Sequence, residues 1–404
     1  MPEGSERVQV LVIGGGPAGA LLAWLLARRG VGTVLVERQR DFAREFRGEV
    51  LMPSGHAMLT AAGLSLGGIP HVRPERIQMY RGRKRFFAAD LSLEEETSPL
   101  GVSQPALLEA LVARADESPH FRFLRGVAAK DLVVEDGRVV GARLQDQDGD
   151  SVWRARLVVG ADGRSSIVRR RQGLPVHDLG APMDIVWAKF PRPPTWTDAQ
   201  VGVYLGGGHL LIGFPAAEDR MLQLAWVILK GTYGDLRSRG IEAWAREMAN
   251  CLDDEVGAHV LRTIDRIDRP FLLDAVTDRV VGWARPGSLV IGDAAHTMSP
   301  VGGQGLNVAM RDAVVAANQL VPAFLDGGDV DAAAARVEPE RGPEIDAIQR
   351  LASFPPRVVL GTRFYHAWAR ALVARLAPTA IAAGRANVVL QTFLHGTEDV
   401  QLRV

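Results

Sequence analysis

The sequence predicts an α/β fold in which a Rossmann-like domain on a parallel sheet is interleaved with a second domain of mixed or antiparallel sheet, followed by a helical C-terminus. Three observations support this prediction. An apolar run at residues 7–13 stops at glycines and leads into a helical pattern and a second apolar run. Similar strand-to-glycine junctions recur at residues 157–163 and 288–292. Helical periodicity dominates from residue 331 onwards.

The first of these regions is a β-α-β unit. The run "RVQVLVI" has the length of a strand and ends at glycine, "ALLAWLLARRG" has helical spacing with Gly30 as its stop, and "VGTVLVER" is a second strand. We expect the two strands to be parallel and their connection to be right-handed.

The turn of this unit contains Gly14, Gly16 and Gly19 in a G-x-G-x-x-G pattern, and Glu37 ends the second strand about 20 residues further on. In this pattern Gly14 makes the tight turn, Gly16 lets the main chain approach a pyrophosphate, and Gly19 lets the helix pack on the strand. The helix N-terminus offers N–H groups to the phosphates. Since Glu37 can accept hydrogen bonds from a ribose diol and disfavours a 2′-phosphate, the pattern favours FAD or NAD over NADP.

The remaining chain alternates between the two kinds of secondary structure. Strand patterns occupy 71–100, 121–160, 183–230 and 288–292, and helical patterns occupy 103–118, 241–256 and 305–321. We therefore expect a discontinuous FAD-binding domain over 1–70, 101–175 and 276–330, a substrate domain over 71–100 and 176–275, and C-terminal helices over 331–404.

Composition excludes several classes of protein. The 404 residues contain 47 Lys and Arg and 47 Asp and Glu, a formal net charge of +0, so no charge excess indicates nucleic acid as a partner. The single cysteine, Cys251, excludes an intrachain disulfide framework and fits a reducing compartment. Residues 7–29 imitate a secretory signal, but the glycine turn explains them better. No apolar run reaches the about 18 residues of a membrane span, so we expect a cytoplasmic protein without stable membrane insertion.

A second glycine-rich segment, "GDAAHTMSPVGGQGLN" at residues 292–307, joins the run "SLVI" to a helical pattern. Glycine is entropically costly to order, so this composition indicates a backbone that bends sharply and comes close to another group.

Residue by residue, 292–307 resembles the GD motif of the FAD-dependent aromatic monooxygenases, the group A flavoprotein hydroxylases typified by para-hydroxybenzoate hydroxylase. "LVVGADGRSS" at 157–166 resembles their DG motif, and 46–64 resembles a segment between the motifs. The resemblance covers residues 8–320. It implies FAD as cofactor, NADH or NADPH as reductant, and dioxygen as co-substrate. The implied reaction is hydroxylation of an electron-rich phenol or heteroaromatic small molecule through a flavin hydroperoxide.

The resemblance also implies contacts to FAD. Asp293 would bond the ribityl chain and Pro300 would lie beside the isoalloxazine ring. The backbone of 303–307 would bring N–H groups to the pyrimidine edge, where they stabilise the charge of the reduced flavin. The full predicted set is Gly14, Gly16, Pro17, Ala18, Gly19, Glu37, Arg38, Arg47, Gln104, Val127, Asp162, Asp293, Pro300, Gly303, Gln304, Gly305, Leu306 and Asn307.

Four members of this set have a structural alternative that the residues leave open. Arg47, expected at the FAD phosphates, fits a surface salt bridge, and Gln104, expected near the ribityl or ribose region, fits a helix surface. Val127, expected to meet adenine through its backbone, fits core packing. Asp162, expected near the flavin and the nicotinamide route, fits a turn.

No catalytic residue and no metal ligand are assigned. His56 and His209 are candidate bases for a phenol, although lone histidines are more often structural, and for His296 we expect a structural role rather than proton chemistry. The apolar composition of 183–230 predicts a pocket for a flat aromatic substrate.

Other functions share parts of this pattern. Halogenases of the superfamily contain a W-x-W-x-I-P signature that none of the eight tryptophans forms. Flavin-dependent reductases share the FAD motifs, and a non-catalytic binding module on a flavoprotein fold is the alternative from another class. A monomer and a homodimer are both compatible with the sequence.

Overall fold

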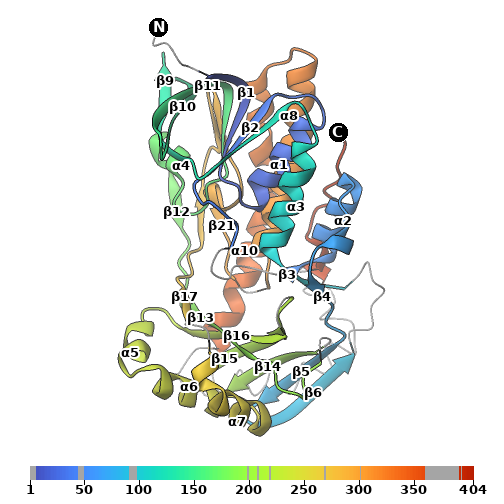
Figure 1. Cartoon of the computed structure of the whole chain (residues 1–404), viewed down its shortest axis with the longest axis vertical. Coiled ribbons are helices and arrows are strands. Elements are labelled where there is room, and N and C mark those ends of the chain that lie inside the picture. The colour runs from blue at the N-terminus through green and yellow to red at the C-terminus, as the bar shows by residue number, and fades with distance from the viewer. Residues whose placement is uncertain are drawn as a thin grey trace.

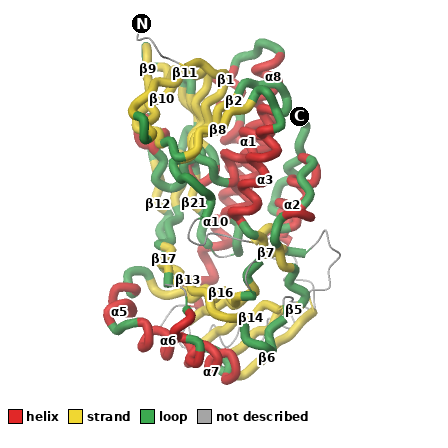
Figure 2. The backbone as a smooth tube through the Cα atoms, viewed as in Figure 1, coloured by secondary structure: helices red, strands yellow, loops and turns green. Residues whose placement is uncertain are grey.

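The computed structural model describes residues 6–43, 50–90, 98–197, 200–206, 209–217, 220–267, 270–300, 302–359, 391–392 and 394–404. Figure 1 shows an elongated molecule in which two sheets lie at opposite ends of the long axis. Figure 2 shows that the strands gather at these two ends, while helices run alongside the larger sheet and between the two bodies.

The first body is built on an eight-stranded sheet whose central strands are parallel: β20 with β11, β11 with β1, β1 with β2, and β2 with β8. Its order is β19 (Ala284–Arg285), β20 (Ser288–Val290), β11 (Gly149–Gly160), β1 (Glu6–Ile13), β2 (Thr33–Glu37) and β8 (Phe121–Arg125). β10 (Arg138–Asp146) pairs with β11 and with β9 (Ala128–Glu135) in an antiparallel meander.

Three helices lie alongside this sheet: α1 (Pro17–Ala27), which contacts both α3 (Gln104–Asp116) and α8 (Gly305–Leu325). In α1 every residue from Ala18 to Ala27 is buried, which explains why its sequence is apolar all round. α3 begins as predicted, because the hydroxyl of Ser103 accepts a hydrogen bond from the N–H of Ala106 at 3.4 Å. Further helices outside the second sheet, among the residues that the structure describes, are α2 (Pro53–Ala62), α4 (Ile167–Arg171), α9 (Val330–Ala335) and α10 (Val337–Val359).

The second body is a seven-stranded sheet in which β14 and β5 are parallel and the other neighbours antiparallel. Its order is β17 (Phe271–Leu273), β13 (Met183–Pro191), β16 (Met221–Leu229), β15 (His209–Pro215), β14 (Gln200–Gly206), β5 (Arg76–Arg81) and β6 (Lys84–Asp90). One face is covered by α5 (Tyr233–Ser238), α6 (Ile241–Asn250) and α7 (Asp254–Arg262), and there Phe190 stacks on Trp244 with ring centroids 6.3 Å apart.

The sequence pattern predicted a single helix over 241–256, and this prediction is wrong. The Asp253 carboxylate accepts hydrogen bonds from the N–H groups of Glu255 and Val256, each at 3.1 Å. An aspartate that caps the next helix in this way ends the preceding one, so α6 and α7 are separate.

Two small sheets lie between the bodies. One has the order β12 (Val176–Asp178), β18 (Asp278–Val280) and β21 (His296–Thr297), and the other β3 (Val50–Leu51), β7 (Leu100–Val102) and β4 (His71–Val72). Single 3-10 turns are η1 (Leu66–Gly68), η3 (Ile264–Arg266) and η4 (Gly292–Ala294). The predicted fold class is confirmed, whereas the domain boundaries stay a prediction.

Candidate functional site

The parallel strands of the large sheet bring the glycine turn, Asp162 and Asp293 together. β1 ends at Ile13, which pairs with Gly160 at the end of β11, and Gly160 pairs in turn with Val290 at the end of β20. The three motifs therefore follow the carboxyl ends of three adjacent parallel strands. In open α/β sheets this edge is where ligands bind.

The three glycines of the turn have different surroundings. Gly14 has φ +106°, and a Cβ on it would lie 2.3 Å from the carbonyl oxygen of Ala161. A Cβ on Gly19 would lie 1.9 Å from the oxygen of Gly14, so only glycine lets α1 pack this closely. A Cβ on Gly16 would meet nothing within 4 Å. Gly16 precedes Pro17 at the start of α1 and has no side chain that could cap the first N–H groups of this helix.

Glu37 is buried at the carboxyl end of β2. Its Oε2 accepts a hydrogen bond from the N–H of Gly15 at 2.8 Å, and its Oε1 accepts one from the N–H of Gln39 at 2.9 Å. These bonds hold the carboxylate beside the glycine turn. Arg38 is exposed at the next position, and the N–H of Val127 donates to the Glu37 carbonyl at 3.0 Å.

Asp162 is the second residue after the end of β11 and is half-buried. Its Oδ2 accepts a hydrogen bond from the N–H of Ile167 at 2.6 Å, while its Oδ1 is buried without a hydrogen-bond partner in the described structure. Burial raises the pKa of the Asp162 carboxyl above its usual range. Gly163 follows at φ +76° with no atom within 4 Å of a Cβ position. A buried carboxylate oxygen beside open space indicates a position for a ligand.

The GD segment continues from Asp293 in η4 to the start of α8. Gly303 has φ +63° and donates its N–H to the carbonyl of Pro300 at 3.2 Å. Gln304 is the N-cap residue of α8, and its side chain does not cap the helix. A Cβ on Gly305 would meet nothing within 4 Å. The N-terminus of α8 therefore resembles that of α1: glycine keeps the space in front of its N–H groups clear.

Leu306 and Asn307 are buried in the first turn of α8. The Asn307 side chain accepts a hydrogen bond from the N–H of Met52 at 2.8 Å and donates to the carbonyl of Val50 at 3.0 Å. It also donates to the Gly303 carbonyl at 3.1 Å. The sequence suggested only the backbone of Asn307 as functional. The structure adds that its side chain ties the loop to β3.

For two other candidate residues, Gln104 and His56, the structure gives the helix on which they lie and their burial. Gln104 is the half-buried first residue of α3, which packs on α1. His56 is half-buried on α2. Arg47 lies outside the described residues.

His209 lies on the face of the second sheet that the helices cover. The Trp226 indole N–H donates to His209 Nδ1 at 3.3 Å, and Trp226 belongs to the cluster packed under α6 and α7. Burial lowers the pKa of His209. This placement agrees with the expectation that a lone histidine is more often structural than a base.

The opposite face of the second sheet is apolar and lies toward the first body (Figure 1). Trp187 meets Phe214 edge-on with ring centroids 5.8 Å apart. Along each strand, side chains point alternately to the two faces of the sheet. Residues that pair across neighbouring strands therefore form a row on the same face. The row is Trp187, Ala225, Ile212, Val203 and Met79.

Sequence reasoning missed a buried charged cluster behind the GD turn. His296 is 1% exposed and its Nε2 lies 2.6 Å from Asp312 Oδ2, which agrees with the expected structural role for this histidine. Arg341 Nε donates to Asp312 Oδ1 at 2.8 Å. The only feature of the sequence that pointed to Asp312 is its charge within the otherwise apolar part of the helical pattern at 305–321.

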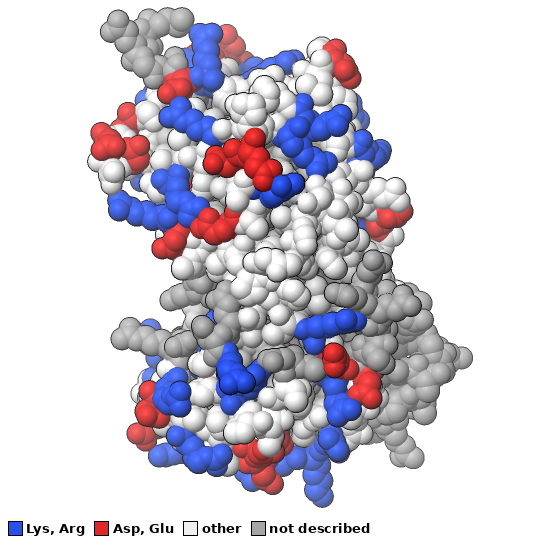
Figure 3. All heavy atoms as spheres, turned by 45° about the vertical axis from the view of Figure 1, so that its right-hand side comes forward, with Lys and Arg blue, Asp and Glu red and all other residues white. Residues whose placement is uncertain are grey.

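The face of the molecule seen in Figure 3 shows no dominant charge. On the face in Figure 3, basic and acidic side chains are interspersed over both bodies. None of the described helices is long and apolar enough to cross a membrane. Within the described ranges, no three His, Cys, Asp or Glu residues are grouped as metal ligands would be.

Known proteins resemble the chain over most of its length. A sequence model of the FAD binding domain family matches residues 7–350. The chain is 33% identical over 412 residues to 6-methylpretetramide 4-monooxygenase of Streptomyces rimosus, covering 100% of this chain and 96% of that enzyme.

Solved structures share the fold. p-Nitrophenol 4-monooxygenase PnpA of Pseudomonas putida DLL-E4 has a TM-score of 0.80 at 18% identity, over 98% of this chain and 100% of that one. P. aeruginosa PqsL in complex with 2-aminobenzoylacetate has a TM-score of 0.77 at 24% identity, over 90% and 99% of the two chains.

Proposed function

The chain belongs to the FAD-dependent aromatic monooxygenases, and we propose that the carboxyl ends of β1, β11 and β20 hold its FAD. The observation that supports this placement best is the pairing of Ile13 with Gly160 and of Gly160 with Val290. This register sets the glycine turn, Asp162 and Asp293 on one edge of the sheet.

The residues present fit FAD. Space is clear at Gly16, Gly163 and Gly305, where a Cβ would meet nothing within 4 Å. Two helix N-termini without side-chain caps, those of α1 and α8, lie beside two of these glycines. Uncapped N–H groups with a positive dipole suit a pyrophosphate and an anionic ring edge, which are the two parts of reduced FAD that need donors.

Each part of the cofactor has a proposed partner. The N-terminus of α1 holds the pyrophosphate, and Glu37 accepts hydrogen bonds from the adenosine ribose. Asp293 accepts one from the ribityl chain. The N–H groups at the start of α8 face the pyrimidine edge of the flavin. Arg38, Arg47, Gln104, Val127 and Pro300 complete the proposed contacts.

When bound, FAD supplies hydride acceptance from NADH or NADPH and the activation of dioxygen. The protein supplies orientation and exclusion of water. The N-terminus of α8 stabilises negative charge next to it. The apolar row around Ile212 forms one wall of a dry compartment, and a flat aromatic substrate fits such a wall through its ring faces.

We propose an electron-rich aromatic, phenol- or heteroaromatic-type small molecule as the substrate. Relatives of the chain include 6-methylpretetramide 4-monooxygenase, so 6-methylpretetramide is the first compound to test beside simple phenols. Dioxygen as co-substrate, a cytoplasmic location and a monomeric or homodimeric state are part of this proposal. A single cysteine is consistent with the proposed location.

The experiment measures NADH and NADPH oxidation by the purified FAD-loaded protein, with and without each aromatic compound. A hydroxylase shows faster oxidation when its substrate is present, and a product heavier by one oxygen atom in mass spectrometry. Reduction of the compound without oxygen gain indicates a reductase, and halide incorporation indicates a halogenase. Protein that releases no flavin on denaturation would refute the FAD site.

The substrate wall is tested by Ile212→Trp, with Leu211→Met as the matched control on the helix-covered face of the same strand. The bulky indole is expected to raise KM for the aromatic at least about tenfold by filling the compartment. FAD affinity should stay as in the wild type. Equal KM values for both variants would show that the substrate binds elsewhere.

A further inference from the structure

Five charged or ionisable side chains form a buried chain of contacts behind the GD turn. They run in the order His296, Asp312, Arg341, Glu344, Arg311, and each is at most 2% exposed. Arg341 contacts both carboxylates through different nitrogens, and Arg311 contacts Glu344. Burying this many charges is costly unless each is paired, and here each carboxylate faces an arginine.

The Asp312 carboxylate connects this chain to the flavin turn. Its Oδ2 accepts a hydrogen bond from the N–H of Gly292 at 2.9 Å and lies 2.6 Å from His296 Nε2. Gly292 and His296 are the two ends of the turn that contains Asp293. One oxygen atom therefore holds both ends of the turn.

Asp312 belongs to α8, whose first residues form the second half of the proposed flavin contact. Its contacts thus set the position of Asp293 relative to the N-terminus of α8. The other carboxylate oxygen, Oδ1, is held by Arg341 from α10. Burial alone would raise the pKa of Asp312, but the charges and hydrogen bonds of His296 and Arg341 hold it below its usual range.

The far end of the buried chain is closed by the C-terminal segment. Arg311 donates to the carbonyl of His395 at 2.8 Å, and the N–H of Thr397 donates to Glu344 Oε1 at 3.0 Å. Gly396 has φ +80°, and a Cβ there would lie 2.1 Å from atoms of both Arg311 and Glu344. Only glycine allows this approach.

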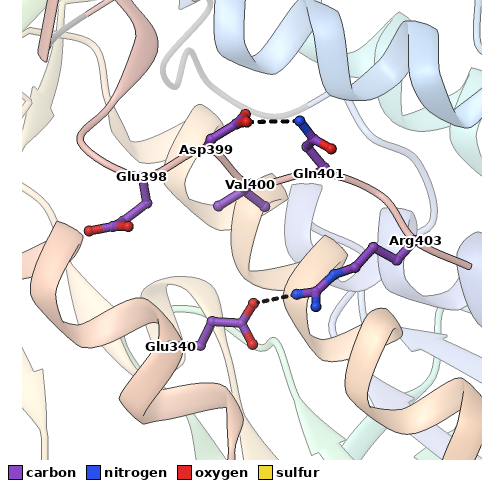
Figure 4. Close-up of a pocket in the computed structure, with 6 residues that line it drawn as sticks. All are labelled: Glu340, Glu398, Asp399, Val400, Gln401 and Arg403. Atoms are coloured by element: carbon purple, nitrogen blue, oxygen red, sulfur yellow. Dashed lines mark hydrogen bonds and ion pairs between the residues drawn. The ribbon is translucent and has the colours of Figure 1, made fainter.

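The same segment continues along α8 and lines a cavity of about 310 Å3 (Figure 4). Arg403 pairs there with Glu340 of α10 at 2.7 Å, and Asn318 of α8 donates to the Gln401 carbonyl at 2.8 Å. Residues 394–404 thus cover one side of α8 and enclose the buried charges.

We propose that Asp312 is a positioning residue of the FAD site, which sets Asp293 against the N-terminus of α8 and is itself held by His296, Arg341 and the C-terminal segment. This inference rests on the proposed placement of FAD. It assigns no proton transfer to His296. Instead, the histidine N–H fixes the carboxylate that fixes the turn.

The test compares FAD binding by the wild type with binding by Asp312→Asn, His296→Leu and His296→Gln. The glutamine keeps an N–H donor toward Asp312, whereas the leucine has none. The matched control is Asp331→Asn. Asp331 Oδ1 likewise accepts a backbone N–H, that of Gly287 at 3.0 Å, and pairs with Arg138, but it lies at the opposite end of β20.

Three readouts are needed: the Kd of FAD by flavin fluorescence, the visible circular dichroism of bound flavin, and urea unfolding of the apoprotein. We expect Asp312→Asn and His296→Leu to raise the Kd about tenfold or more and to change the visible spectrum, as loss of charge-assisted hydrogen bonds predicts. His296→Gln should recover most of the affinity. Asp331→Asn should lower only stability.

Two results would overturn the inference. One is wild-type Kd and spectrum in His296→Leu and Asp312→Asn. The other is an equal rise of Kd in Asp331→Asn at equal loss of apoprotein stability, because the effect would then be general destabilisation. If Asp312→Asn does not fold, the comparison of His296→Leu with His296→Gln tests the inference instead. A wild-type protein that binds no FAD overturns the proposed function as well.

Discussion

Gly16 and Gly19 belong to one fingerprint, yet replacing each by alanine should affect a different property: the stability of the apoprotein for Gly19 and the binding of FAD for Gly16. A Cβ on Gly19 would lie 1.9 Å from the Gly14 oxygen, whereas contacts below 3.0 Å are essentially never found, so α1 or the turn must move by at least 3.0 − 1.9 = 1.1 Å. The Gly14 oxygen belongs to the backbone, so it cannot turn aside as the end of a flexible side chain could. We expect Gly19→Ala to lower the free energy of unfolding by about 3 kcal/mol, the upper end for overpacking.

Gly16→Ala should leave the apoprotein almost unchanged. Gly16 has φ −72° and ψ −178°, which alanine adopts without strain, and no atom lies within 4 Å of the new Cβ. Alanine should raise the free energy of unfolding by about 0.4–1 kcal/mol because it restricts the unfolded chain. It should lower the same free energy by a similar amount because it is a poorer helix cap than glycine. The net change should stay within about 0.5 kcal/mol.

FAD binding, by contrast, should be weakened by Gly16→Ala. If the pyrophosphate lies against Gly16, the methyl group costs about 1–3 kcal/mol of binding, or a rise in Kd of about fivefold to 150-fold. Urea unfolding of the apoprotein and titration with FAD measure the two effects separately. Wild-type FAD affinity in a well-folded Gly16→Ala would refute the placement of the pyrophosphate, and wild-type stability of Gly19→Ala would refute the packing argument.

Three further predictions follow from the site. Glu37→Gln should raise the Kd of FAD about fivefold to tenfold in the same titration, since a charged acceptor for the ribose becomes neutral; an unchanged Kd would remove Glu37 from the site. Asn307→Ala should lower the free energy of unfolding by about 3 kcal/mol, because three hydrogen bonds at 2.8, 3.0 and 3.1 Å are lost; a loss below about 1 kcal/mol in urea unfolding would contradict this. Asp162 has a raised pKa in the folded state, so its ionisation favours unfolding as pH rises above the usual value of 3.8. Asp162→Asn should therefore stabilise the apoprotein near pH 7 relative to the wild type, and the gain should fall when urea unfolding is repeated toward pH 4; a gain independent of pH would contradict the argument.

Local patterns predicted much of the fold. The glycine fingerprint lies within residues that are close in sequence, and its turn has the φ values that only glycine favours, as at Gly14. The Asp-Gly pair at Asp136 and Gly137, between β9 and β10, is another local turn signal, and these residues have φ +47° and +76°. In both cases the physical cause is the backbone conformation of a few consecutive residues, and that is what a sequence pattern reports.

Features that depend on distant partners were not predictable. The side-chain bonds of Asn307 reach Val50 and Met52, and those of Asp312 reach Arg341 on another helix. The sequence did not predict which face of β15 the helices cover, because each alternating set of "HLLIGFP" contains large apolar residues, Leu211 in one and Leu210 and Ile212 in the other.

The backbone ladder explains why the site needs Asp312 at all. Ala161 donates to the Ile13 carbonyl at 2.8 Å and Ile291 donates to the Gly160 carbonyl at 2.9 Å, so sheet hydrogen bonds continue to the residue before the GD turn. Beyond Ile291 the chain leaves the sheet, and Gly292 takes φ +60°. The N–H of Gly292 therefore donates to the Asp312 carboxylate of α8 instead of to a neighbouring strand. The sheet and the Glu37 carboxylate thus hold the glycine turn, whereas the turn that contains Asp293 is tied to α8 by the buried carboxylate of Asp312.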